Sequence, residues 1–183
     1  MLYPSTAFYT PEELEDWRQG HRDAFPDGYW KRGTGTFGFG ESVVARYFMA
    51  IGYQCIHHDY DIFGSNRPQK YPKSEEILVA FLGTDRLAAL RQIHRLFWPL
   101  RDRGRVPVEV PDLLIYKADF SELRFAESKL LLTRDKLNPR QILGLALISS
   151  LLRSQIDLFY VAAHGTSPKL EPVRQALPWS PES

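Results

Sequence analysis

The sequence predicts an α/β fold, and three patterns carry this prediction. Two apolar, β-prone segments, residues 110–116 and 123–130, flank a polar stretch and predict a β-hairpin. A helix with an apolar stripe, residues 40–52, precedes a short strand at 53–58. A second long helix opens at Asn138. Helices and strands thus alternate along the chain, as they do in α/β proteins.

The chain of 183 residues is long enough for one domain with a hydrophobic core. We expect an N-terminal helical arm and loop at 1–38, a core at 39–164 whose last strand is 156–163, and a Pro-rich tail at 165–183. The 23 basic and 22 acidic residues nearly balance, so any nucleic-acid contact has to come from local patches.

The composition favours a cytoplasmic protein. The single cysteine, Cys55, excludes an internal disulfide and a zinc site built on cysteines, and it fits a reducing compartment. The first residues lack the basic start and apolar run of a signal peptide. No segment approaches the ~20 apolar residues of a membrane span, so we expect no membrane partner.

The N-terminal region is expected to be mostly irregular. Residues 1–9 carry no clear pattern, whereas Thr10 begins a capping box and predicts a helix to about residue 22. The Gly-rich loop at 25–39 could approach a phosphate backbone, although a simple connector is the interpretation that we favour. Its basic residues are Lys31 and Arg32.

A helical insertion is expected at about 62–105, with helices at 74–82 and 84–97. Arginines gather in and after its second helix, beside aromatic side chains that suit contacts with phosphates and bases. The alternative is an ordinary solvated helix face. These arginines are Arg86, Arg91, Arg95, Arg101, Arg103 and Arg105.

The predicted hairpin brings charged side chains together. If its loop closes about the midpoint, Leu114 lies opposite Phe125 and Asp112 lies opposite Glu127, with Lys129 on the same face. Two opposed carboxylates are unfavourable unless a cation binds both, and Mg²⁺ prefers such oxygen ligands. The alternative is a surface cluster on a solvated sheet face, against which the apolar neighbours argue.

Other polar residues have ordinary explanations. Glu41, on the inward stripe of its helix, complements the positive end of the helix dipole, yet an inward glutamate also needs a partner. Gln141 completes a capping box that starts at Asn138. His57 and His58, near two aspartates, suggest zinc, but adjacent residues of a strand point to opposite faces, so surface histidines are expected.

Three motifs in this order resemble the PD-(D/E)xK nuclease superfamily, and within it the VRR-NUC group. They are Pro111-Asp112, Glu127-Ser128-Lys129 and Arg134-Asp135-Lys136-Leu137-Asn138-Pro139-Arg140-Gln141. The resemblance covers about residues 40–163. It implies a restriction-endonuclease-like αβββαβ core, from whose simplest layout the expected helical insertion between the first and second core strands departs. Two features depart from the group: three leucines follow Lys129 in place of a Gly-Pro-Gly-type turn, and Ser128 replaces an apolar residue.

The resemblance implies a nuclease that hydrolyses phosphodiester bonds in duplex or branched DNA with Mg²⁺ or Mn²⁺. Its ligands to the ion would be Asp112, Glu127 and the main-chain carbonyl of Ser128, with Glu41 holding a second ion or a water molecule. Lys129 would position and activate the attacking water, and Gln141 would help to position water or substrate. A homodimer is an open option. The alternatives are a catalytically inactive nucleic-acid-binding or protein-interaction module on the same fold and, least favoured, a histidine-metal hydrolase that uses His57, His58 or His164.

Overall fold

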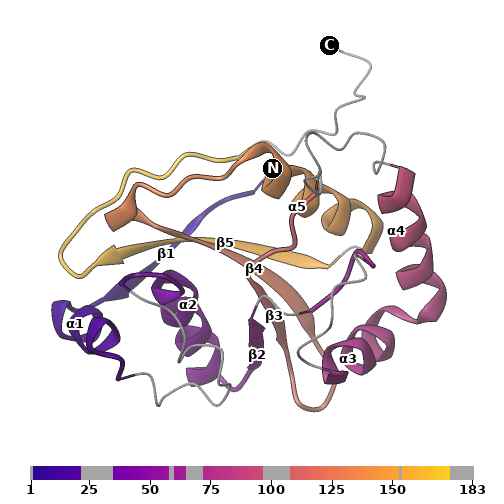
Figure 1. Ribbon diagram of the computed structural model, residues 1–183, viewed down its shortest axis with the longest axis horizontal. Helices are drawn as coiled ribbons and strands as arrows, with labels where there is room; N and C mark the ends of the chain where they lie inside the picture. Colours follow the sequence, from indigo (N-terminus) through magenta and orange to yellow (C-terminus); the bar gives the residue numbers. More distant parts are fainter. Residues whose placement is uncertain are drawn as a thin grey trace, which may run out of the picture.

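The computed structural model describes residues 2–21, 35–57, 60–64, 72–96, 108–152 and 154–173. It confirms the α/β prediction, since a five-stranded mixed sheet carries helices on both faces (Figure 1). The described part has a short 3-10 helix, η3 (Leu131–Thr133), and the α-helices α1 (Pro11–Gln19), α2 (Phe39–Ala50), α3 (Pro72–Leu82), α4 (Thr84–Leu96) and α5 (Pro139–Leu152). Within this part of the chain, no helix combines the length and apolar character needed to cross a membrane.

The sheet has the strand order β1-β5-β4-β3-β2. Its strands are β1 (Ser5–Tyr9), β2 (Gln54–His57), β3 (Leu113–Tyr116), β4 (Leu123–Leu130) and β5 (Gln155–Ala163). The neighbours β2–β3 and β3–β4 are antiparallel, whereas β4–β5 and β5–β1 are parallel. The helix α5 lies in the crossover connection that the parallel pair β4–β5 requires.

The strand β1 shows that the prediction of an irregular segment at 1–9 was wrong. Ala7 and Tyr9 belong to the core, and every residue of the strand pairs with β5. Beyond β5, Val173 in the predicted tail forms an isolated bridge with Leu2. A short strand with two buried positions carries little local signal, and its partner lies at the far end of the chain. Pairing with that partner, rather than local propensity, therefore determines β1.

The predicted helices are present, with changes at their ends. The capping box is confirmed, since Thr10 N–H donates to Glu13 and Glu13 N–H donates to the Thr10 hydroxyl. Helix α1 ends at Gln19, earlier than expected, because Gly20 adopts a left-handed conformation (φ 87°) that closes it. Helices α3 and α4 form the predicted insertion between β2 and β3.

Alternate residues of the central strands serve two cores. Leu113 and Ile115 belong to the core beneath α1 and α2. Leu114 belongs to the core on the other side, with residues of α3, α4 and α5. Helix α5 runs so close to the segment before β3 that a Cβ atom at Gly144 would collide with the main-chain oxygen of Glu109. Tight packing on both faces thus fixes the ends of β3 and β4.

Candidate active site

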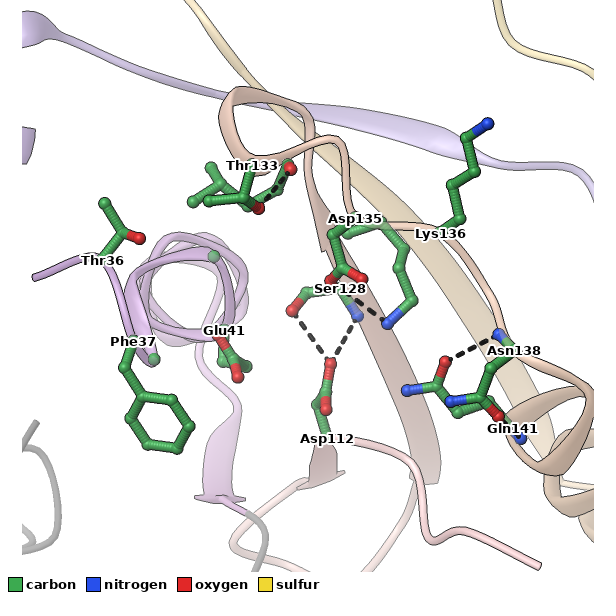
Figure 2. A pocket seen from close by; sticks show the side chains of 14 residues that line it. Thr36, Phe37, Glu41, Asp112, Ser128, Thr133, Asp135, Lys136, Asn138 and Gln141 are labelled. Carbon is green, nitrogen blue, oxygen red and sulfur yellow. Dashed lines mark hydrogen bonds and ion pairs between the residues drawn. The ribbon is translucent and has the colours of Figure 1, made fainter.

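A cavity of about 530 Å³ opens where β4 meets the first turns of α2 and α5 (Figure 2). Residues that are far apart in the sequence line it together. Those predicted for the site are Glu41, Asp112, Ser128, Lys129 and Gln141. In Figure 2 the side chains of Glu41 and Asp112 are directed toward the same space, and Gln141 lies across it from Glu41.

The register of the hairpin is the predicted one, with Leu114 opposite Phe125. Asp112 stands one residue before β3, and continuing the register by one residue places it opposite Glu127. Asp112 Oδ2 accepts hydrogen bonds from the main-chain N–H (2.9 Å) and the hydroxyl (3.0 Å) of Ser128. Only the carbonyl of Ser128 was predicted to take part, so its role in holding Asp112 was missed.

Glu127 and Lys129 form a buried ion pair at the wall of the cavity, which Lys129 lines. Lys129 Nζ donates to Glu127 Oε1 at 2.6 Å, and the two side chains are 3% and 0% exposed. Glu127 is not among the residues that line the cavity, which differs from the expected convergence of both carboxylates and the lysine. Glu127 differs from the expectation because its buried carboxylate needs a positive partner, and the amine of Lys129 is that partner. Its second oxygen, Oε2, is buried and has no hydrogen-bond partner among the described residues.

The buried charges perturb one another. Burial raises the pKa of Asp112 to about 6, and the charge of Glu41 adds to this rise. Burial, together with the Asp112 carboxylate, raises the pKa of Glu127 well above its ordinary value. Burial works to lower the pKa of Lys129, but Glu127 and Asp112 outweigh it, so this pKa is raised and the amine stays protonated at neutral pH. Burial and mutual repulsion of the carboxylates thus outweigh the attraction of Lys129 in the pKa values of Asp112 and Glu127.

The first turn of α2 brings Glu41 to the cavity (Figure 2). Helix α2 approaches β4 closely, since a Cβ atom at Gly40 would lie 3.5 Å from Ser128 Oγ. Glu41 Oε1 also lies 3.7 Å from His57 Nε2. The expectation of a surface histidine was wrong for His57, which is buried because α2 packs against β2.

Gln141 lines the cavity and completes the predicted capping box of α5. Asn138 Oδ1 accepts from the N–H groups of Gln141 (3.0 Å) and Arg140 (2.9 Å), and Gln141 Oε1 accepts from Asn138 N–H (3.1 Å). Asn138 Nδ2 also donates to Glu109 at 3.0 Å. Because the side-chain oxygen of Gln141 serves the cap, its NH₂ group is the part that could bind water or substrate. That role stays a prediction.

Several further residues line the cavity without having been predicted for the site, among them Asp135 and Phe37. Asp135 Oδ2 lies 3.5 Å from Lys129 Nζ and, unlike Glu127, Asp135 lines the cavity. Phe37, in the turn before α2, is 56% exposed at the edge of the cavity. Asp135 belongs to one of the motifs on which the resemblance to the nuclease superfamily rests, but no role was predicted for it.

Most of the predicted nucleic-acid contacts fall outside the described residues, namely Lys31, Arg32, Arg101, Arg103 and Arg105. Arg95 is exposed on α4. Arg91 donates to both carboxylate oxygens of Glu75 (2.8 and 2.6 Å) and to the carbonyl of Asp61 (2.7 Å). It therefore ties α4 to α3 and to the preceding segment. Contact of Arg91 or Arg95 with nucleic acid stays a prediction.

The predicted donors are oxygen atoms, the type of ligand that a hard divalent cation takes. Among the described residues, no group of three or more histidine, cysteine, aspartate or glutamate side chains forms a metal site by itself. The predicted set combines two carboxylates with the carbonyl of Ser128, which are the oxygen ligands that Mg²⁺ takes together with water. Glu127 Oε2 is buried without a hydrogen-bond partner among the described side chains, and burial together with Glu41 raises the pKa of Asp112.

The two described histidines of the predicted metal site, His57 and His164, lie in different parts of the sheet. His57 lies at the end of β2, at one edge of the sheet. His164 follows β5, which is separated from β2 by the strands β3 and β4. Its ring stacks on Phe8. His58 lies outside the described residues. Of the described histidines, His57 and His164 therefore do not come together at one site.

Comparisons with protein-family models, with curated proteins and with solved structures gave no match. The function therefore has to be argued from the site itself.

Proposed function

We propose that this protein is a metal-dependent nuclease of the PD-(D/E)xK type that hydrolyses phosphodiester bonds in DNA. The observation that carries the proposal is the cavity that Glu41, Asp112, Ser128, Lys129 and Gln141 line together. Carboxylates beside a buried lysine and a helix start suit the binding of a cation and a phosphate, whereas their mutual repulsion makes a purely structural role costly.

The order of elements supports the proposal. From α2 to β5 the chain runs helix, three strands, helix and strand, once the inserted α3 and α4 are set aside. The first three of these strands are antiparallel neighbours, and the last pairs in parallel with the third. This is the αβββαβ order that the resemblance implies, with α1 and β1 as additions to it.

The residues divide the proposed chemistry among them. A divalent cation held by Asp112, Glu127 and the carbonyl of Ser128, when bound, supplies positive charge that stabilises charge developing on the phosphate. Lys129 acts as a cation, because its raised pKa keeps it protonated. Its N–H groups would position the attacking water and donate to the phosphate. Glu41 holds a second ion or a water molecule, and the NH₂ group of Gln141 binds water or substrate.

One observation favours the alternative, an inactive module that binds nucleic acid or protein on the same fold. Glu127 is buried in an ion pair with Lys129 and does not line the cavity. In an inactive module this pair would be a permanent structural element, whereas in a nuclease Glu127 would exchange the amine for a cation. A rise in melting temperature with Mn²⁺ that vanishes in Glu127→Ala supports the nuclease. The absence of any rise in the wild type supports the inactive module.

Cleavage of DNA tests the proposal directly. Labelled duplex, nicked, flapped and branched DNA is incubated with Mg²⁺ or Mn²⁺ and the wild type, Asp112→Ala or Asp119→Ala, the last being an exposed aspartate outside the cavity. Loss of Asp112 should cost several kcal/mol of transition-state stabilisation, or about 10³-fold in rate. The Asp119 variant should retain its activity. Equal activity of Asp112→Ala and the wild type would eliminate the site assignment.

A further inference from the structure

Lys129 stands between two carboxylates that differ in burial. Its Nζ atom lies 2.6 Å from Glu127 Oε1 and 3.5 Å from Asp135 Oδ2. The side chain of Glu127 is fully buried, whereas that of Asp135 is 44% exposed and lines the cavity together with Lys129. The amine of Lys129 thus pairs closely with the buried carboxylate of Glu127. It has a longer contact with the carboxylate of Asp135, which lines the cavity.

The chain after β4 returns Asp135 to this position. The 3-10 helix η3 follows β4 directly, and Arg134 then adopts a left-handed conformation (φ 56°). This conformation costs a residue other than glycine roughly 1 kcal/mol or more. The N–H of Asp135 donates to the carbonyl of Leu130 at 3.3 Å, so the chain doubles back beside the end of β4. A loop that keeps such a conformation holds Asp135 in a defined place.

We propose that Asp135 is the positioning residue for Lys129 and receives its amine when Glu127 turns to a bound cation. This inference rests on the proposed function. A cation bound at the other oxygen of Glu127, Oε2, would share one carboxylate with the amine, which lies 2.6 Å from Oε1, and would bring two positive charges close together. A buried ammonium that loses its partner is strongly destabilising, so the amine needs a second carboxylate.

Asp135 meets this need with little movement. Its Oδ2 atom, at 3.5 Å, is within about 1 Å of a full charge-assisted hydrogen bond to Nζ. The shift carries the amine away from the buried side and toward the cavity, where the attacking water has to be oriented. Asp135 therefore acts through Lys129 and needs no contact with the substrate.

A double-variant cycle on Mn²⁺ affinity tests this inference. Calorimetry measures Mn²⁺ binding to the wild type, Asp135→Asn, Lys129→Met and the double variant. Asp135→Asn should weaken binding roughly tenfold in the wild type, because the displaced amine has no partner. In the Lys129→Met background the same change should alter the affinity by less than about twofold, since no amine has to move. Asp135→Glu keeps a carboxylate and should retain most of the affinity.

Controls keep the outcomes distinct. Glu76→Gln removes the same charge at an exposed position of α3, outside the cavity, and should leave Mn²⁺ binding unchanged. Circular dichroism checks folding, and Lys129→Gln replaces Lys129→Met if that variant does not fold. Equal weakening in both backgrounds, or no weakening in either, overturns the role of Asp135 while the proposed function stands. If the wild type binds no Mn²⁺, the proposed function fails and this inference fails with it.

Discussion

Replacing Asp112 with asparagine should stabilise the metal-free protein above pH 6, although it removes a residue of the site. Asp112 is buried, and burial together with the charge of Glu41 raises its pKa to about 6. Asparagine has nearly the same shape, and its side-chain oxygen can still accept from the N–H and hydroxyl of Ser128. The substitution removes an unfavourable charge and keeps the contact.

The expected magnitude follows from the pKa of Asp112. The difference between 3.8 and about 6 corresponds to about 3 kcal/mol in the free energy of unfolding once the carboxyl is ionised. Hydrogen bonds from Ser128 to a neutral acceptor are weaker than those to a carboxylate, which removes about 1 kcal/mol of the gain. The net stabilisation is about 2 kcal/mol, or a rise of about 6 °C in melting temperature for a chain of this size.

The pH dependence has a definite sign. Because the folded protein binds the Asp112 proton more tightly than the unfolded chain does, this residue lowers the wild-type stability as the pH rises from about 4 to about 6. Asp112→Asn does not lose stability in this way. The difference in the free energy of unfolding between the two proteins should therefore grow across this pH window and stay constant above it.

Urea unfolding of both proteins at pH 4, 6 and 8 measures this difference. Asp119→Asn is the control, since hydrogen bonds from Ser121 lower the pKa of that exposed carboxyl and its substitution should bring no gain in stability at pH 8. If Asp112→Asn is no more stable than the wild type at pH 8, the carboxylate is not under strain and the physical argument for a cation fails.

Other substitutions test the packing and the helix start. Gly144→Ala should destabilise the protein by about 3 kcal/mol or more in urea unfolding, because its Cβ atom would meet the main-chain oxygen of Glu109. A loss below about 0.5 kcal/mol would contradict that close contact. Asn138→Ala should lower the free energy of unfolding in urea by about 1 kcal/mol, because it removes the cap of α5. Unchanged stability would show that the cap is dispensable. Gln141→Glu keeps an oxygen for the cap but loses the NH₂ group. The stability should be unchanged, while the rate of DNA cleavage should fall at least tenfold, roughly 1.4 kcal/mol in activation free energy. Full activity would show that Gln141 serves only the cap. Arg91→Ala should lower the free energy of unfolding by about 1 kcal/mol through loss of its bidentate pair with α3, and wild-type stability would mean that the pair is not stabilising.

The parts of the fold that were predictable depend on local patterns. Strand β4 has its predicted bounds, and Leu114 faces Phe125, because the apolar positions alternate and the loop closes about its midpoint. The start of α5 was predictable because the capping box involves only residues Asn138 to Gln141. The place of Asp112 followed from that register.

The features that could not be predicted depend on contacts between distant segments. Strand β1 exists because β5 pairs with it, and His57 is buried because α2 covers the end of β2. Glu127 is withdrawn from the cavity because its partner is the lysine two residues later, whereas the expected partner was a cation. The contact of Asp135 with Lys129 depends on the left-handed conformation of Arg134. An arginine in the sequence does not predict such a conformation.

Anomalous diffraction from crystals of the wild type grown with Mn²⁺ tests the central claim most directly, since it locates the ion itself. We expect one strong peak bonded to Asp112, Glu127 and the carbonyl of Ser128, with Lys129 Nζ moved from Glu127 to Asp135. A cavity without a peak at millimolar Mn²⁺, or a peak that leaves the ion pair of Glu127 and Lys129 intact, would contradict the account.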